Sequence, residues 1–434
     1  MLSKPQIPPL NNAPGKLPAR PRFQENKLTD YPKLRDLYAI PSVAMTVLIM
    51  AYSGLYGVYP ILLLYAMWLS RVIFKGHFIL KPSKDIYPAI GFASYCILTT
   101  LWSDYPGITI HAAVEFFTMI LCAIVMVRIV RTESLIKGMI VGTTLVLITT
   151  IISGRYGKDA FSESYALIGM FGSKNQVGLY AEVGMFASLV FLFTKSGKLQ
   201  KFLYSICPLL FACLCLYLSR SGTAIATLVA TLFAVYGIYR VVRFSPRNRK
   251  TALSFVIFVV SITLLAGIYM GGAAFSLKLM GKDATLTGRT YLWAEGIKNG
   301  LLNPVGGVGY SAFWVVGRQA AETYWFKFGI NARNGFHFHN LYIQTFADLG
   351  FVGLFWMIYM IISNCTKSLR YALLHGSSAK AFFCLGMAFM FLFRAFAEVD
   401  FLGPFGIGCL MFFSVNPLLA TKEQTEMKLT ASPL

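Results

Sequence analysis

The sequence predicts an all-α integral membrane protein with about twelve transmembrane helices and one large extracytoplasmic loop. Composition is the first observation: 56% of the 434 residues are apolar, only 13% are charged and the mean hydropathy is +0.61. A soluble protein of this length is far less apolar. The second is that the apolar residues form runs long enough to cross ~30 Å of hydrocarbon as helices. The third is that basic residues cluster between these runs, as topology signals do.

The apolar runs define the predicted helices in chain order. They lie at 38–55, 57–74, 86–103, 109–130, 136–153, 176–194, 202–218, 222–241, 252–275, 341–363, 379–397 and 403–420. When the N-terminus is placed inside, the intracellular segments hold most of the 39 Lys and Arg residues, as the positive-inside rule requires. Both termini are therefore expected in the cytoplasm.

The helices divide the chain into five expected parts. These are a flexible basic tail at 1–36, transmembrane helices at 37–276, a periplasmic loop at 277–340, further transmembrane helices at 341–420 and a short tail at 421–434. The first tail has no apolar core, so no cleavable signal peptide is expected. The eight cysteines fall in or beside apolar runs without a CxxC pair, which argues against a disulfide framework or a zinc site.

The net charge of +21 is a value that nucleic-acid-binding proteins also reach. Here the basic residues are dispersed between apolar runs and form no stripe on a soluble domain, so nucleic acid is not an expected partner.

Two parts of the loop at 277–340 are predicted to be helical, because a loop of this length without structure is uncommon. Thr287 is expected to cap the first helix, which ends at Asn303–Pro304. Its apolar residues recur every four positions, at Trp293, Ile297 and Leu301. Ser311 is expected to open the second helix, whose aromatic residues are Phe313, Trp314, Tyr324, Trp325 and Phe326. Amphipathic aromatic helices of this kind suit a membrane interface.

His339 is the first candidate for chemistry. It follows Phe336-His337-Phe338 and precedes an apolar run, so its ring is expected at the outer mouth of a membrane helix. An imidazole exchanges a proton near neutral pH, which an apolar span cannot do. The alternative interpretation is an interfacial histidine that is hydrogen-bonded to a loop carbonyl.

Arg289 and Arg220 are candidate anion-binding residues. Arg289 lies in the first turn of the predicted loop helix, where free backbone N–H groups and a guanidinium together favour an anion. Arg220 lies where the seventh and eighth predicted helices meet on the outer side, and a charge there opposes the inside bias and requires an anionic partner. The alternative for Arg289 is a surface arginine beside a helix cap.

Lys174 opens the sixth predicted helix on the same outer face. Together with Asn175 and the neighbouring glycines it forms a plausible resting place for a phosphate or a sugar. The alternative is a lysine that snorkels at a helix end. Arg394 and Glu398 are four residues apart on a predicted helix and are expected to pair with each other.

A metal-dependent sugar transferase needs paired carboxylates, which the predicted outer loop lacks. Its acidic residues, Asp283, Glu295 and Glu322, are well separated, and no Asp-x-Asp occurs. The glycine-rich stretch 306–309 follows no strand of a βαβ unit, so a nucleotide-binding loop is excluded. No metal and no other cofactor is therefore expected.

The motif His339-Asn340, nine residues, then Gly350-Phe351-Val352-Gly353 resembles the O-antigen ligase superfamily. Two further segments carry the resemblance, Thr287-Gly288-Arg289 with Trp293, and Ser219–Gly222. The superfamily contains O-antigen ligases, O-antigen polymerases and exopolysaccharide polymerases. The resemblance covers about residues 170–420 and implies a GT-C-like membrane fold.

The resemblance implies transfer of a glycan from undecaprenyl pyrophosphate to a sugar hydroxyl on the periplasmic face, without nucleotide sugar or metal. His339 is then the expected general base, and Arg289 and Arg220 are expected to hold the pyrophosphate. The expected substrate-binding residues are Lys174, Asn175, His337, Asn340 and Trp293. The partners it implies are the lipid-linked oligosaccharide, the growing polysaccharide, the lipid bilayer of the bacterial inner membrane and a chain-length or export co-polymerase.

Within the superfamily, the segment 172–178 is similar to exopolysaccharide polymerases of the succinoglycan type, which favours a polymerase. A ligase that transfers the glycan to lipid A-core is the alternative, and protein-glycosylating members rank third. A transporter, a flippase or a non-catalytic export partner is the alternative of another class. Transporters place ionisable groups near mid-bilayer at broken helices, whereas the candidates here gather at one outer face, which favours an enzyme.

Overall fold

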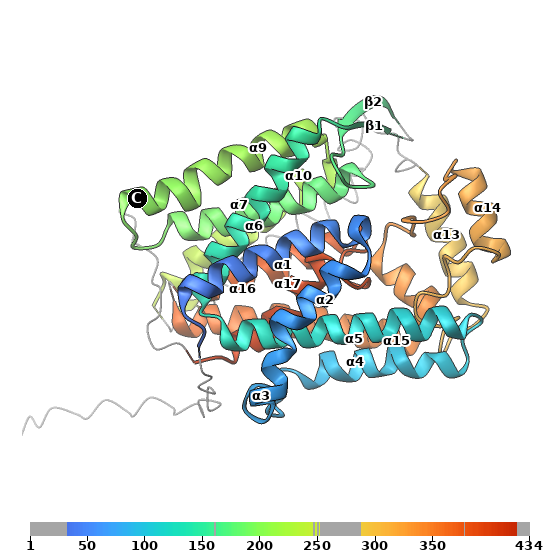
Figure 1. The fold of residues 1–434 in the computed structure, drawn as a ribbon, viewed down its shortest axis with the longest axis horizontal. Helices are drawn as coiled ribbons and strands as arrows, with labels where there is room; N and C mark the ends of the chain where they lie inside the picture. The colour runs from blue at the N-terminus through green and yellow to red at the C-terminus, as the bar shows by residue number, and fades with distance from the viewer. Residues whose placement is uncertain are drawn as a thin grey trace, which may run out of the picture.

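The computed structural model describes residues 33–159, 162–245, 248–249, 251, 288–376 and 378–422. These residues form a bundle of long helices with a small cap of two short helices at one end (Figure 1). Most of the N-terminal tail, the predicted helix at 252–275 and Thr287 lie outside the described residues.

Every predicted apolar run within the described residues coincides with a helix of the bundle. The helices are α1 (Asp36–Tyr56), α2 (Val58–Trp68), α3 (Ser70–Ile79), α4 (Tyr87–Leu98), α5 (Pro106–Ile129), α6 (Thr132–Ser153), α7 (Lys174–Leu192), α8 (Lys198–Lys201), α9 (Cys207–Ser219), α10 (Gly222–Val242), α15 (Leu341–His375), α16 (Ala379–Arg394) and α17 (Ile407–Leu419). In the described part of the chain, seven of the helical segments are long and apolar enough to cross a membrane. The chain is thus a multi-pass, mostly helical membrane protein, and the count of twelve spans stays a prediction.

Small residues bring the bundle helices together. Gly138 and Gly142, four residues apart on α6, face Val43 and Val47 of α1, and an added Cβ on either glycine would press into those valines. Helices in lipid gain stability from such close packing, because lipid tails are as apolar as the side chains themselves. At the centre, α16 packs against α7, α10, α15 and α17.

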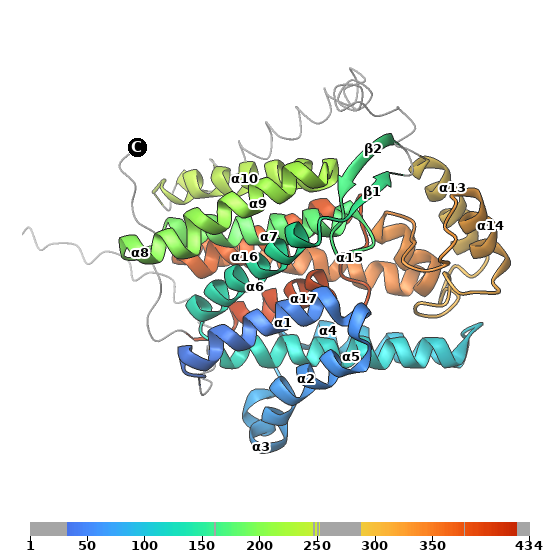
Figure 2. The ribbon, with the colours of Figure 1, turned by 45° about the horizontal axis from the view of Figure 1, so that its top comes forward.

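A two-stranded hairpin departs from the predicted all-α fold. β1 (Tyr156–Asp159) pairs antiparallel with β2 (Ser162–Leu167), with Tyr156 opposite Leu167. It follows Gly154, which ends α6 in the left-handed conformation. The hairpin lies at the same end of the bundle as the cap (Figure 2). Its short strands carry no long apolar run, so no membrane helix was predicted there.

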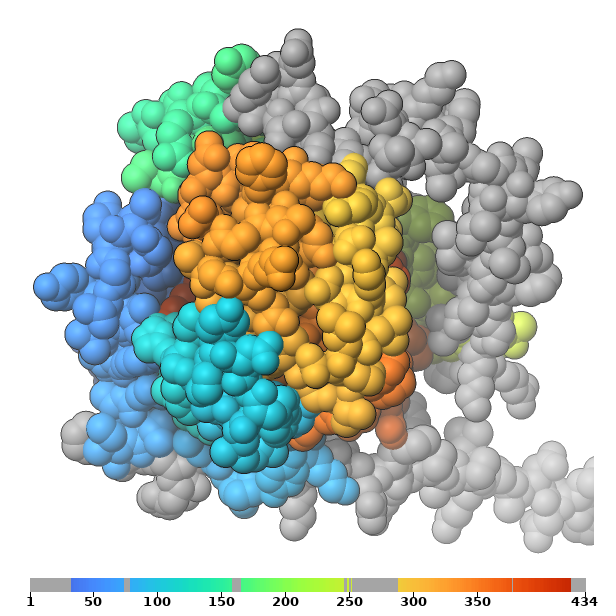
Figure 3. Space-filling model, turned by 90° about the vertical axis from the view of Figure 1, so that its right-hand side faces the viewer, coloured from blue at the N-terminus to red at the C-terminus, as the bar shows by residue number. Residues whose placement is uncertain are grey.

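The cap consists of α13 (Arg289–Gly300) and α14 (Gln319–Lys327), which cover the end of the bundle beside the tip of α5 (Figure 3). The predicted start of the second helix at Ser311 is wrong. Ser311 has a φ of 58°, a left-handed conformation that cannot continue into a right-handed helix, and α14 begins only at Gln319. The aromatic residues still gather, and Phe313, Tyr324 and Phe338 form the core of the cap.

The first loop helix packs against the rest of the protein through small residues that lie next to its predicted apolar positions. Ile297 is 46% exposed and Leu301 is 57% exposed, whereas Leu292, Gly296 and Gly300 are buried. The two glycines lie directly against Phe338 and Phe346, whose rings occupy the space that a Cβ would need. Periodicity of large apolar residues missed this face, because the close contact depends on residues without side chains.

The glycine-rich stretch 306–309 docks onto a kink in α15. At the kink, Gly350 has a φ of 64° and a ψ of −165°, and its Cα hydrogens face the carbonyl of Val305. Four backbone hydrogen bonds join the two segments. They run from the N–H groups of Val308, Gly309, Phe351 and Val352 to the carbonyl oxygens of Ala347, Asp348, Pro304 and Val305. The glycines therefore fix the outer loop to the helix that begins beside His339.

Replacing Gly350 with alanine is expected to lower the thermal midpoint of the purified protein in detergent. A φ of 64° with a ψ of −165° is a backbone conformation that essentially only glycine adopts, at a cost of about 1–3 kcal/mol for other residues, and the Val305 carbonyl leaves no room for a Cβ. Tryptophan fluorescence during heating measures the effect. Gly237→Ala in α10 is the control, because open space surrounds Gly237 and its midpoint should stay or rise. Equal midpoints for both variants would contradict the proposed role of the kink.

Candidate active site

Asn340 sets the start of α15 and with it the position of His339. Its side-chain oxygen accepts hydrogen bonds from the backbone N–H groups of Tyr342 (3.0 Å) and Ile343 (3.2 Å), as an N-cap residue does. Its amide nitrogen donates to the carbonyl of Phe396 at 3.3 Å. The start of α15 is therefore tied to the segment that follows α16.

His337 and His339 lie in a tight turn just before the N-cap residue Asn340. His339 has a φ of 51°, which turns its backbone N–H toward the Nδ1 atom of His337 at 3.0 Å. Nδ1 of His337 is thus an acceptor, so the proton of that ring sits on Nε2. Burial, followed by the neighbouring His339, lowers the pKa of His337 to about 3. His337 is therefore neutral at physiological pH.

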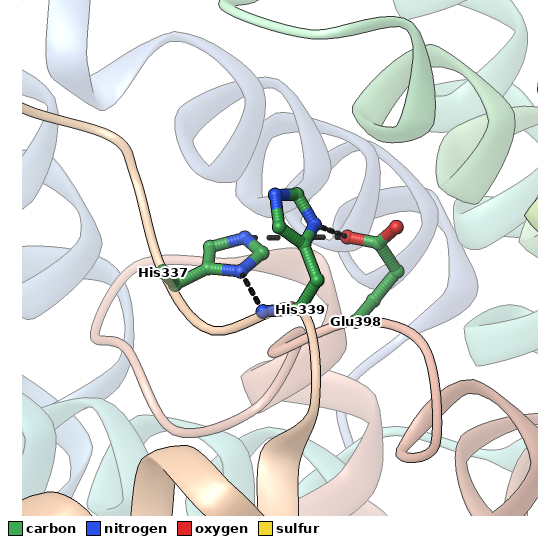
Figure 4. Close-up of side chains that lie close together, drawn as sticks. All are labelled: His337, His339 and Glu398. Atoms are coloured by element: carbon green, nitrogen blue, oxygen red, sulfur yellow. Dashed lines mark hydrogen bonds and ion pairs between the residues drawn. The ribbon is translucent and has the colours of Figure 1, made fainter. Parts of the chain in front are cut away.

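Glu398 lies at the centre of the site (Figure 4). Its carboxylate is 5% exposed and faces donors from separate elements. Asn175 Nδ2 donates to Oε1 at 2.6 Å, and Arg289 Nη2 donates to the same oxygen at 3.1 Å. The other oxygen, Oε2, lies 3.6 Å from His339 Nδ1 and 4.0 Å from His337 Nε2.

The electrostatic balance at Glu398 favours the ionised carboxylate. Burial raises the pKa of Glu398, but the contact with His339, followed by the effects of His337 and Arg289, outweighs burial and holds that pKa below its ordinary value. A buried carboxylate is retained only when such donors compensate its lost hydration.

Arg289 is the first residue of α13, as predicted, although Gly288 and not Thr287 precedes it as the N-cap. Nη1 donates to the carbonyl of Ala397 at 3.1 Å while Nη2 holds Glu398. A guanidinium has five N–H donors, and these two contacts use two of them. The helix start adds the partial positive charge of its backbone N–H groups.

Arg220 ends α9 in the left-handed conformation, with a φ of 46°. Its side chain is exposed and forms no hydrogen bond or ion pair with the part of the chain that the structure describes. Its neighbour Ser221 is buried, caps α10 and donates to Asn175 Oδ1 at 3.0 Å. Because Asn175 in turn holds Glu398, Arg220 lies at the edge of the network that contains Arg289 and His339.

Three of the five predicted substrate-binding residues hold the site together, and the other two are His337 and Lys174. Asn175, Asn340 and Trp293 use polar atoms to hold the site together, and Trp293 Nε1 donates to the carbonyl of Phe338 at 3.0 Å. His337 contributes to the turn described above. Lys174 begins α7 as predicted, is partly buried and follows the cap residue Ser173.

The predicted pairing of Arg394 with Glu398 is wrong. Helix α16 ends at Arg394, so the spacing of four no longer places the two side chains on one face. Arg394 instead donates to Glu182 at 2.9 Å and to Asp400 at 2.6 Å. Glu398 is the functional candidate that sequence reasoning missed. An acidic residue at the outer end of a span, opposite a surplus of basic groups, was the signal that could have identified it.

The ligand atoms of His337, His339 and Glu398 lie within 4.8 Å of one another, close enough for one cation. The surroundings do not suit one, because Arg289 already places a positive charge on the same carboxylate. Asn175 directs an N–H donor at it as well. The cluster is better described as an anchored pair of histidines beside an anion-binding arginine.

The chain is similar to known proteins over most of its length. Residues 207–358 match the family model described as O-antigen ligase, and this range contains Arg220, Arg289 and His339. The chain is also 30% identical over 394 residues to the exopolysaccharide production protein ExoQ of Rhizobium meliloti (strain 1021), covering 91% of each protein. Asn175 and Glu398 lie outside the matched range, and the structure joins them to it. The chain belongs to the O-antigen ligase family.

Proposed function

We propose that the protein is a glycosyltransferase that polymerises oligosaccharide repeat units linked to undecaprenyl pyrophosphate into exopolysaccharide. The reaction takes place on the periplasmic face of the bacterial inner membrane, with both termini in the cytoplasm. The observation that carries the proposal is the meeting of His339 and Arg289 on one buried carboxylate at the capped end of the bundle. Similarity to an exopolysaccharide production protein favours polymerisation over other uses of this chemistry.

His339 is the proposed general base. With Nδ1 directed at Glu398, its Nε2 takes the proton of the acceptor hydroxyl as that oxygen attacks the anomeric carbon of the donor sugar. The bond between the anomeric carbon and the phosphate oxygen breaks, and undecaprenyl pyrophosphate leaves with the electron pair. A direct displacement of this kind inverts the anomeric configuration.

Arg289 and Arg220 are proposed to stabilise the negative charge that builds on the leaving pyrophosphate. Arg289 combines the guanidinium with the start of α13, so the donors are already oriented before the reaction. Arg220, at the end of α9, is proposed to add its exposed guanidinium next to Ser221, which holds Asn175. A partly buried Lys174 adds a third basic group beside the sugar or the phosphate.

Reconstitution of the purified protein with lipid-linked repeat units tests the proposal. We expect products of many repeats together with released undecaprenyl pyrophosphate. Transfer of a single glycan to lipid A-core would identify a ligase, and movement of the lipid-linked substrate across vesicles without new glycosidic bonds would identify a flippase. A protein that has none of these activities and only supports export would fit a scaffold. For the proposed polymerase, a chain-length or export co-polymerase is an expected partner.

Activity is expected to continue in the presence of a chelator such as EDTA. Arg289 and the start of α13 supply the positive charge that a metal ion provides in other transferases. The measurement compares the rate of polymer formation before and after exhaustive chelation. Loss of activity that Mg²⁺ or Mn²⁺ restores would overturn metal independence and would assign the cluster of His337, His339 and Glu398 to a cation.

A further inference from the structure

We propose that Glu398 is a positioning residue for the transfer reaction, holding His339 in the tautomer and orientation that a general base requires. The inference rests on the proposed function, because it assigns Glu398 a role only through His339. It concerns a residue outside the range that the family model matches and outside the residues that the sequence motif suggested.

The contacts of His339 determine what Glu398 can do. Nδ1 of His339 is buried and has no hydrogen-bond partner at ordinary distance among the described residues, and Glu398 Oε2 lies 3.6 Å from it. A carboxylate beside Nδ1 favours a proton on that nitrogen, which leaves the lone pair on Nε2. Figure 4 shows the other ring nitrogen of His339 on the side of the ring away from Glu398.

His337 and Glu398 restrict the ring from two sides. His337 lies beside it with the ring centroids 4.3 Å apart, and it cannot supply a proton acceptor to Nδ1, because its own acceptor nitrogen is used by the backbone of His339. Of the two neighbours, only the carboxylate can accept from Nδ1. The tautomer of His339 therefore depends on Glu398.

Glu398 also fixes the distance between the base and the phosphate-binding group. Oε1 accepts from Arg289 while Oε2 faces His339, so one rigid carboxylate spans both. Asn175 anchors Oε1 from α7 and is itself held by Ser221 at the start of α10. The charged groups around the site are Arg289, Asp400 and, further back, Arg394.

Glu398→Gln is the variant that tests the inference. Glutamine keeps the size of the side chain and an oxygen for Arg289 and Asn175, but it removes the charge that orders the His339 ring. We expect kcat to fall about 100-fold, the lower part of the range that a positioned base supplies, while KM for the lipid-linked donor changes less than about threefold. Glu115→Gln is the control, because Glu115 also contacts a histidine, His111 on α5, at 3.8 Å but lies on another part of the bundle.

A spectroscopic measurement separates positioning from a structural role. In ¹⁵N spectra of histidine-labelled protein, the His339 signal, assigned by its loss in His339→Ala, should report a proton on Nδ1 in the wild type. In Glu398→Gln the signal should shift toward the Nε2-protonated form, with the thermal midpoint unchanged.

Wild-type kcat in Glu398→Gln, an unchanged His339 signal, or a loss of activity that follows a lowered thermal midpoint or a raised KM would each overturn the role of Glu398. These outcomes differ from failure of the proposed function, in which His339→Ala itself still forms polymer.

Discussion

Replacing His339 with alanine is expected to reduce polymer formation by about 10²–10⁴-fold, the contribution of a positioned general base. The ring is 20% exposed at the mouth of α15, so its loss leaves no large cavity in the bundle. The backbone turn before α15 is held by Asn340 and stays in place. The defect should therefore appear in the rate of the chemical step and leave the amount of folded protein unchanged.

The measurement is the length and quantity of polymer made by reconstituted protein, with the folded fraction determined by size-exclusion chromatography. His111→Ala is the matched control, because His111 is 76% exposed on α5 and, in the described part of the chain, pairs with Glu115 at 3.8 Å. Long polymer from His339→Ala at normal protein abundance would refute general-base catalysis by this residue and would favour a scaffold or export role.

Replacing Arg289 with lysine is expected to lower kcat/KM for the lipid-linked donor by about 10²–10³-fold, comparable to the loss of one oriented donor at a developing charge. Lysine keeps the charge but has no planar fork. The fork of Arg289 holds the carbonyl of Ala397 and the carboxylate of Glu398 at the same time, each at 3.1 Å. A single ammonium cannot keep both contacts and also bind a phosphate oxygen.

The release of undecaprenyl pyrophosphate over a range of donor concentrations measures this effect. Arg333→Lys is the control, since Arg333 is 54% exposed in the same outer region and pairs with Glu322 at 3.2 Å. If Arg289→Lys transfers at the wild-type rate, positive charge without fork geometry is sufficient, and the proposed pyrophosphate clamp is wrong.

The sequence predicted the bundle well because apolar runs of membrane length have few alternatives to a helix. It placed Lys174 and Arg289 correctly at helix starts, where polar residues interrupt those runs. It failed where the local signal was weak. The hairpin at 156–167 has no long apolar run, and the buried face of α13 is formed by Gly296 and Gly300, which carry no hydrophobic signal.

In the candidate site, too, the sequence predicted the residues that belong to a motif and missed a contact between distant positions. Motif reasoning identified His339 and Arg289, which the structure brings to one carboxylate, whereas the side chain of Arg220 forms no hydrogen bond or ion pair with a described residue. An ion pair between Glu398 and Arg394 was predicted because the helix predicted at 379–397 extends about one turn beyond the end of α16. Its partners come from positions 175, 289, 337 and 339, and spacing along the chain does not reveal contacts between residues so far apart.

For the polymerase that we propose, the docking of 306–309 on the bend at Gly350 has a mechanical consequence for chain growth. His339 lies just before the N-cap residue of this helix, and the segment 304–309 binds the same helix about ten residues further on, so α15 holds both the outer loop and the end that carries His339. A polymer that grows over many cycles must then move along an outer loop that stays in place. We expect processivity to depend on how loosely the glycan is held and only weakly on movement of the reactive side chains.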